Sequence, residues 1–125
     1  KLDKFNFFIL CGPNEKEISS EVINRVEKKN VTDLSNMNIS EVIPFLVSAN
    51  MYVGNDSFGS HISSQSGKPS IVILLDSPKA YTDYSPNHFR IVPEGYDISN
   101  INHGSKIDPN LVKVDQVYQK ILNYI

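Results

Sequence analysis

The stretch Val53-Gly-Asn-Asp-Ser-Phe-Gly-Ser-His61 runs directly into Ile62-Ser-Ser-Gln-Ser-Gly-Lys-Pro69 and then into Ser70-Ile-Val-Ile-Leu-Leu75. This order predicts a strand, a polar turn, a short helix that stops at Gly67 and Pro69, and a second, buried strand. Free N–H groups and the positive end of the helix dipole meet at such a turn. A nucleotide or another phosphorylated ligand is therefore the first ligand to expect.

Strands and helices alternate along the rest of the chain. Apolar or β-branched runs predict strands at residues 5–11, 31–34, 51–53, 70–75 and 89–92. Helical spacing predicts four helices, which begin at or near Asn14, Ser40, Ser57 and Val114. This alternation predicts an α/β fold, a parallel sheet with helices on both faces. The polar turns 12–14, 54–57 and 76–78 would then meet at the carboxyl ends of the strands, where such sheets bind ligands.

Three local features carry more specific expectations. The nearly continuous apolar run Phe5–Cys11 predicts a strand buried on both faces. The first helix is expected to end near Lys28 and Lys29. The helix around Pro44 has two candidate caps, Ser40 or the pair Asn38 and Glu41 in a capping box. We favour Ser40, because it keeps Pro44 at the edge of the first turn.

The composition describes an ordinary soluble domain. The chain has 125 residues, enough for one domain with its own core, and a net charge of −2, which does not favour a nucleic-acid partner. One cysteine, Cys11, excludes an internal disulfide. No apolar segment approaches the roughly 20 residues of a membrane-spanning helix. The chain begins at Lys1 without an initiator Met, and we interpret it as part of a longer protein.

The turn after the third expected strand can be interpreted in two ways. Backbone N–H groups at Ser57 to Ser60 and the hydroxyls of Ser57 and Ser60 are suited to a phosphate. The alternative is that Asn55, Asp56 and Ser57 only cap the helix, without any ligand. Asp56 would repel a phosphate, so it is expected to cap the helix, orient the loop or accept a bond from a ligand hydroxyl. His61 either donates to a phosphate oxygen or packs under the loop, bonded to backbone.

Other kinds of site find little support. His61, His88 and His103 are widely separated, and no carboxylate–histidine spacing matches a metal site, so no metal is expected. Neither a Walker phosphate loop, a Gly-x-Gly-x-x-Gly fingerprint nor a Gly-x-Ser-x-Gly elbow occurs. Tyr81, Tyr84 and Phe89 either stack on a base or anchor a loop.

Residues 53–78 resemble the C-terminal domain of glycosyltransferase family 9, the family of the lipopolysaccharide heptosyltransferases. The family pattern runs Gly-Asn-Asp-Ser/Thr-Gly-x-x-His, a helix of small residues, Gly-x-Pro, an apolar strand and a Gly-Pro-Thr-like turn. The order and spacing agree from Phe7 to Val92, and the specific part lies between Val53 and Pro78. Two positions depart from the pattern: Phe58 stands where the family has Gly, and Leu75-Asp76 replaces the Gly of the later turn.

This resemblance implies the fold and the domain organisation. It implies that residues 1–125 form a single Rossmann-like domain, the nucleotide-sugar-binding C-terminal half of a GT-B glycosyltransferase. The N-terminal acceptor domain, with the expected catalytic base, would be absent from this chain. The resemblance also implies donor or phosphate contacts at Asn55, Asp56, Ser57, Phe58, Gly59, Ser60, His61, Asp76 and Ser77. Gly12, Pro13, Thr32 and Asp33 would form the pocket wall.

The function implied is transfer of a sugar, heptose-like or other, from a nucleotide-sugar donor to a lipopolysaccharide, surface-glycan or glycoprotein acceptor. No metal or other cofactor is expected, and the fragment alone is expected to be inactive. The acceptor, a glycan or lipid-linked molecule, would bind through the missing domain. The location implied is the cytoplasm of a bacterium, including the inner face of the inner membrane through peripheral association of the full-length protein. The alternatives are another GT-B enzyme, such as a sugar-nucleotide epimerase, and a non-catalytic nucleotide-binding or interaction domain.

Overall fold

The structure, a computed structural model, describes residues 4–26 and 30–125. The chain divides into two units, Lys1–Phe45 and Leu46–Ile125. The expected helix end at Lys28 and Lys29 lies outside the described residues. The assignment of residues 1–125 to one domain stays a prediction.

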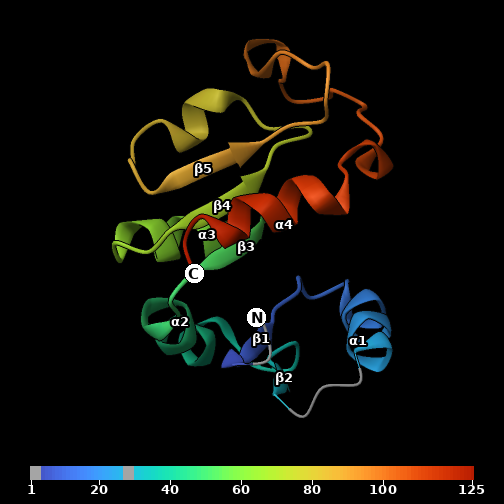
Figure 1. The fold of residues 1–125 in the computed structure, drawn as a ribbon. Helices are drawn as coiled ribbons and strands as arrows, with labels where there is room; N and C mark the ends of the chain where they lie inside the picture. The colour runs from blue at the N-terminus through green and yellow to red at the C-terminus, as the bar shows by residue number, and fades with distance from the viewer. Residues whose placement is uncertain (1–3, 27–29) are drawn as a thin grey trace. The chain divides into compact units, whose positions relative to one another are not determined.

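The first unit is built on two parallel strands joined by a helix. Its elements are β1 (Phe7–Ile9), α1 (Lys16–Arg25) and β2 (Val31–Asp33), and Phe7 lies opposite Val31 in the sheet (Figure 1). The expectation that the first strand is buried on both faces is wrong. The Phe8 ring packs 5.1 Å from the Phe45 ring yet is 40% exposed, because a two-stranded sheet has too few neighbouring side chains to cover both faces.

The helix α2 (Ile39–Ser48) begins two residues earlier than favoured from the sequence. Asn38 Oδ1 accepts from the Glu41 N–H at 3.1 Å, and Glu41 Oε2 accepts from the Asn38 N–H at 2.8 Å. Asn38 and Glu41 thus form the capping box, and the expectation that Ser40 is the cap is wrong. Pro44 lies in the helix interior, because two reciprocal capping bonds outweigh the one backbone bond that a proline removes.

The second unit contains a parallel sheet of three strands. Its strands and helices, in chain order, are β3 (Tyr52–Asn55), α3 (Phe58–Gln65), β4 (Ser70–Ile73), β5 (His88–Ile91) and α4 (Val114–Leu122). The strand order is β3-β4-β5, with Asn55 opposite Ile73. Short 3-10 turns at Lys79–Thr82, Ile98–Asn100 and Pro109–Leu111 connect these elements.

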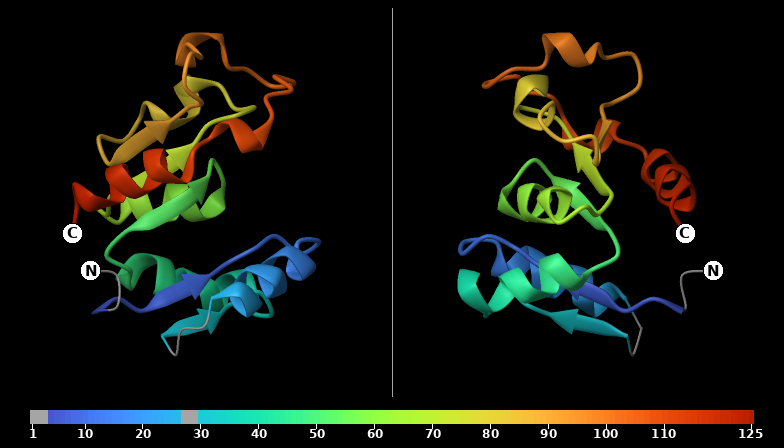
Figure 2. Two further views of the ribbon diagram at one scale, coloured as in Figure 1. Left: turned by 45° about the vertical axis from the view of Figure 1, so that its right-hand side comes forward. Right: turned by 90° about the vertical axis from the view of Figure 1, so that its left-hand side faces the viewer.

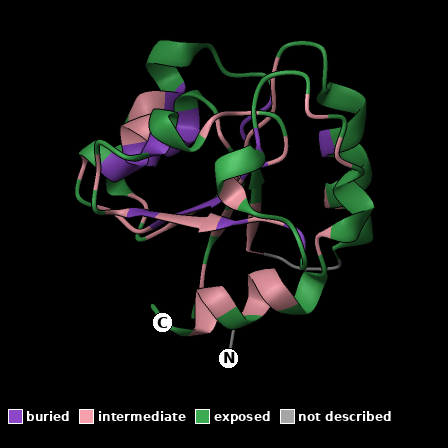
Figure 3. Ribbon diagram, turned by 90° about the horizontal axis from the view of Figure 1, so that it is seen from above, coloured by how far each residue is buried: buried purple, intermediate pink, exposed green. Residues whose placement is uncertain are grey.

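The three-stranded sheet is covered by α3 on one face and α4 on the other (Figure 2). Three apolar residues of the central strand segment, Ile71, Val72 and Leu74, are fully buried, and the most buried segments belong to this sheet and to α3 (Figure 3). The predicted α/β fold with parallel strands is therefore confirmed, with the strands in two sheets. Among the described residues, no helix is long and apolar enough to cross a membrane.

The helix α3 packs on the sheet through very small residues. Its buried positions are Gly59, Ser60, Ser63 and Ser64. As predicted, Gly67 ends the helix in the left-handed region at φ +77°, and the Lys68 N–H donates to the Ser63 carbonyl at 3.0 Å. Small side chains let a helix lie close to its sheet, so the loop that leads into α3 is held against the ends of β3 and β4.

Candidate functional site

The turn between β3 and α3 forms a capped helix start. Ser57 is the N-cap, its N–H donates to Ser60 Oγ at 3.2 Å, and Ser60 Oγ donates to the Ser57 carbonyl at 2.7 Å. Ser60 is fully buried, so its hydroxyl is used inside the cap. The next two N–H groups, those of Phe58 and Gly59, donate to no acceptor within residues 4–26 and 30–125. These two N–H groups are the ones left for an anion.

Tyr52, which no sequence motif marks, supports this turn from β3. Its hydroxyl lies 3.1 Å from Ser57 Oγ and donates to the Asn55 carbonyl at 3.2 Å. The pKa of the Tyr52 phenol is raised above its ordinary value, mainly because the phenol is buried. The hydrogen bond with Ser57 offsets part of this rise, and the charge of Asp56 adds to it. The ring occupies the space that a side chain would need at Gly54 or Gly59, since a Cβ at either would lie 2.6 Å from the ring or its hydroxyl. The sequence signal for this role of Tyr52 is the pair of glycines, because they leave room for a large side chain beside the turn.

Asp56 and His61 face each other beside the helix start. Asp56 Oδ1 lies 3.3 Å from His61 Nε2, and the Asp56 side chain is only 5% exposed. The contact lacks hydrogen-bond geometry, so this buried oxygen has no hydrogen-bond partner in the described part of the chain. Of the three roles expected for Asp56, capping is excluded because Ser57 is the N-cap.

The other ring nitrogen of His61 is held by an aromatic residue from the loop before β5. His61 Nδ1 lies 2.6 Å from the Tyr84 hydroxyl. The sequence expectation that His61, if packed, would be bonded to backbone is therefore wrong. His88 has that environment instead: its ring nitrogens lie 3.2 Å from the Thr82 carbonyl and 3.3 Å from the Ser60 carbonyl.

The later turn, at Asp76 and Ser77, follows the strand next to β3. Because Asn55 pairs with Ile73 in a parallel sheet, both turns lie at the same carboxyl edge. Asp76 is exposed and Ser77 is half-buried. The convergence of these two turns, predicted from the alternation of elements, is thus present in the second unit.

Asn55 lies on the opposite face of the sheet from His61. Adjacent residues of a strand face opposite sides of the sheet, so Asn55 and Gly54 lie on different faces. Asn55 lines a depression of about 410 Å³ beside α4. The lining is otherwise apolar and aromatic: Ile73, Leu75, Pro109, Val112, Val114, Val117, Tyr118 and Ile121. The predicted donor residues therefore divide into an α3 side with Asp56 and His61 and an α4 side with the Asn55 side chain.

The predicted pocket-wall residues Gly12, Pro13, Thr32 and Asp33 belong to the first unit. Glu15 Oε2 accepts from the Gly12 N–H at 2.8 Å, and Thr32 is exposed in β2. The Ser35 N–H donates to Asp33 Oδ1 at 2.8 Å, and this bond holds the pKa of Asp33 below its ordinary value. In both turns a carboxylate satisfies a backbone N–H, which is a structural role.

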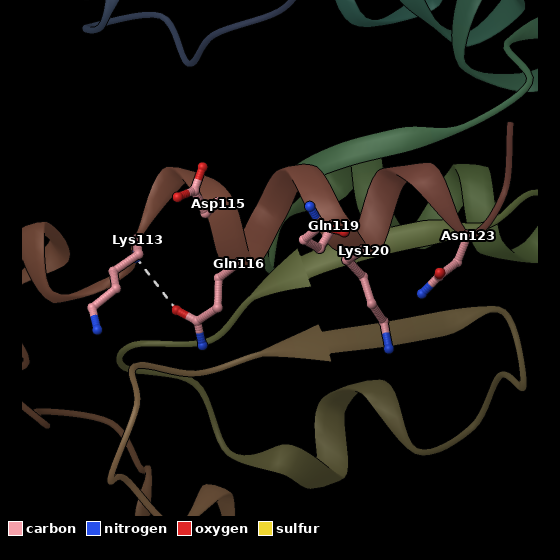
Figure 4. A pocket seen from close by; sticks show the side chains of 6 residues that line it. All are labelled: Lys113, Asp115, Gln116, Gln119, Lys120 and Asn123. Atoms are coloured by element: carbon pink, nitrogen blue, oxygen red, sulfur yellow. Dashed lines mark hydrogen bonds between the residues drawn. The ribbon is translucent and has the colours of Figure 1, made fainter. Parts of the chain in front are cut away.

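A larger depression, of about 500 Å³, runs along α4 and contains none of the predicted residues. Figure 4 shows Gln116 and Lys120 extending from α4 toward β5. Gln116 Nε2 donates to the Val92 carbonyl at 3.0 Å, and Lys120 Nζ lies 5.7 Å from the centre of the Phe89 ring. These side chains fasten α4 to the sheet and leave few groups for a ligand. Among the described residues, no cluster of three His, Cys, Asp or Glu is placed to hold a metal ion.

Comparison with known proteins gives two matches. A family model described as glycosyltransferase family 9 (heptosyltransferase) matches residues 3–108. A lipopolysaccharide heptosyltransferase 1 from Campylobacter coli is 29% identical over 96 residues, which are 75% of this chain and 28% of that protein. The chain thus spans about a quarter of the length of this relative. No solved structure matches the chain.

Proposed function

The chain belongs to glycosyltransferase family 9, and from this premise we propose that it is the nucleotide-sugar-binding domain of a GT-B glycosyltransferase. The whole enzyme would transfer a sugar, heptose-like or other, from its donor to a lipopolysaccharide, another surface glycan or a glycoprotein. The relative from Campylobacter coli supports the first of these acceptors. The proposed location is the cytoplasm, at the inner face of the inner membrane.

The observation that carries the proposal is the start of α3 within the matched segment. The N–H groups of Phe58 and Gly59 have no protein acceptor in the described part of the chain, and they lie at the positive end of an eight-residue helix. A diphosphate bound there would gain two backbone donors. The same donors would stabilise the negative charge that develops on the departing nucleoside diphosphate during transfer.

The remaining parts of the reaction would come from outside this chain. An inverting displacement needs a base that removes the proton of the acceptor hydroxyl. We assign that base to an N-terminal acceptor domain, as the resemblance implies. This fragment is accordingly expected to bind nucleotide weakly and to transfer no sugar, and sugar transfer by the 125-residue chain would contradict that assignment.

Amide NMR of this chain, titrated with ADP, UDP, GDP and CMP, tests the binding site. We expect one nucleotide to shift the signals of residues 54–61 and 76–77. Ser57→Ala should weaken its binding about three- to tenfold, the worth of one hydrogen bond. Ser66→Ala is the matched control, because Ser66 Oγ donates to the Ile62 carbonyl at the far end of the same helix. Shifts confined to other residues, or equal effects of both variants, would contradict the proposed site.

A non-catalytic domain that kept the scaffold is the second candidate, and one observation favours it. The side chains expected to reach the ligand are already engaged: Ser57 with Tyr52, Ser60 within the cap and His61 between Asp56 and Tyr84. A full-length chain that binds nucleotide sugar but transfers nothing to an acceptor would support this candidate. Conversion of free nucleotide sugar without acceptor would instead indicate an epimerase.

A further inference from the structure

We propose that Tyr84 is a positioning residue for His61, a role that rests on the proposed function of the α3 start as a donor site. The Tyr84 hydroxyl donates to His61 Nδ1 and directs the protonated Nε2 toward the buried carboxylate of Asp56. The imidazole is thereby held against Asp56, the residue that precedes the N-cap Ser57 of α3.

The direction of each contact follows from the chemistry of the partners. A carboxylate oxygen repels the lone pair of a bare ring nitrogen and attracts an N–H, so the His61 nitrogen that faces Asp56, Nε2, is the one assigned the proton. A neutral imidazole has one protonated nitrogen, and Nδ1 is then an acceptor. The Tyr84 hydroxyl, 2.6 Å away, must therefore be the donor.

Of the two contacts, the one with Tyr84 fixes the ring. The distance to Tyr84 is that of a short hydrogen bond, whereas the 3.3 Å contact with Asp56 lacks hydrogen-bond geometry. The two rings also lie close, with centroids 5.8 Å apart and planes inclined by 31°. Without the tyrosine hydroxyl, the imidazole would keep its ring contacts with Tyr84 and His88, and its only remaining polar contact among these residues would be the weaker one with Asp56.

Tyr84 is itself held in place by the residues around it. Its ring meets the buried His88 ring edge-on, with centroids 5.2 Å apart. The preceding segment is anchored to β5, because Arg90 donates to Thr82 Oγ1 at 2.5 Å and to Asp83 Oδ1 at 2.6 Å. The hydroxyl therefore comes from a fixed support, although the Tyr84 side chain is half exposed.

The chain offers a matched control in Tyr81. Its hydroxyl lies 3.0 Å from His103 Nε2, its ring centroid lies 5.3 Å from that of His103, and it is 51% exposed against 50% for Tyr84. Tyr81→Phe removes the same group from the same kind of pair, one that does not include His61. An effect on His61 that is specific to Tyr84→Phe therefore reports the bond at the site.

Nitrogen-15 NMR of the histidine rings tests the inference without any ligand. In the unchanged chain at alkaline pH, where imidazoles in general are neutral, we expect His61 to be protonated at Nε2. Tyr84→Phe should lower the ratio of the Nε2–H to the Nδ1–H form about three- to tenfold, and Tyr81→Phe should leave it unchanged. The His88 ring signals show whether the aromatic cluster remains packed. Unchanged His61 signals in a packed Tyr84→Phe protein would overturn the inference.

A second measurement separates this inference from the proposed function. With the nucleotide that shifts residues 54–61, Tyr84→Phe should bind about three- to tenfold more weakly and Tyr81→Phe equally well. If the His61 tautomer responds to Tyr84→Phe but none of the four nucleotides binds either protein, the proposed donor site is contradicted, whereas the hydrogen bond from Tyr84 to His61 is supported. If a nucleotide binds the unchanged chain and Tyr84→Phe equally well, the positioning role is refuted and the donor site stands.

Discussion

Replacing Gly59 by alanine should destabilise the second unit, although alanine is the better helix former. Gly59 lies in the first turn of α3 with no positive φ, so an alanine needs no backbone change. The obstacle is the Tyr52 ring, since a Cβ at residue 59 would lie 2.6 Å from Cε2 and 3.3 Å from Cζ. Ordinary contact begins near 3.4 Å, so the shortfall is most of an ångström.

Two opposing effects set the magnitude of the change. Helix propensity favours alanine over glycine by about 1 kcal/mol. Forcing a methyl into a packed contact costs about 1–3 kcal/mol, and moving the ring would weaken the Tyr52 bonds with Ser57 and Asn55 by about 0.5–1.5 kcal/mol each. The overlap and the weakened bonds together exceed the gain in helix propensity, and we expect a net loss of about 1–5 kcal/mol in the free energy of unfolding.

Urea unfolding followed by far-ultraviolet circular dichroism measures this loss, and a double-mutant cycle identifies its cause. In a Tyr52→Ala background the ring is gone, so Gly59→Ala should be neutral or stabilising there. A loss of equal size in both backgrounds would refute the overlap. Gly67→Ala is the matched control, because a Cβ there meets nothing within 4 Å and its cost comes only from the φ of +77°, so it should be the same with or without Tyr52.

Two further predictions concern the α2 cap and the buried phenol. Asn38→Ala should lower the free energy of unfolding by about 1 kcal/mol, because Asn38 makes the capping box, and Ser40→Ala should lower it by less. The same urea unfolding measures both losses. A larger loss for Ser40→Ala would show that Ser40 is the cap. The pKa of Tyr52 is raised above its ordinary value of 10.0, so the unfolded chain loses this proton at lower pH than the folded chain and stability falls as the pH rises above 10.0. Thermal unfolding between pH 8 and pH 11 should show a steeper fall for the unchanged chain than for Tyr52→Phe, and parallel curves would contradict the raised pKa.

Local sequence signals predicted the second unit well. The serine cap at residue 57, the left-handed Gly67 and the apolar run of β4 each act within a few residues, so their consequences can be derived from the sequence alone. Parallel pairing of β3 with β4 followed from the helix between them, and it placed the two polar turns at one edge.

The errors came from contacts between distant parts of the chain or from competing local signals. The contacts of His61 with Asp56 and Tyr84 join residues five and 23 positions away, and no spacing rule predicts the second. The role of Tyr52 depends on two glycines on neighbouring elements. At α2 the interior Pro44 disfavours the earlier helix start and the capping box of Asn38 and Glu41 favours it, and the sequence does not show which effect is larger. The apolar run around Phe8 predicts a buried strand, but the two-stranded sheet of β1 and β2 leaves Phe8 exposed.

The buried face of α3 has one more consequence, for the entropy of folding. Gly59, Ser60, Ser63 and Ser64 have few or no rotatable side-chain bonds. Burying them freezes few rotamers, whereas a face of leucines would lose about 0.5–1 kcal/mol of side-chain entropy per residue. The helix also has few alternative packings, because no large side chain can exchange one pocket for another. The helix α3 therefore docks on its sheet at a low cost in side-chain entropy, and the same docking positions the backbone donors at its start.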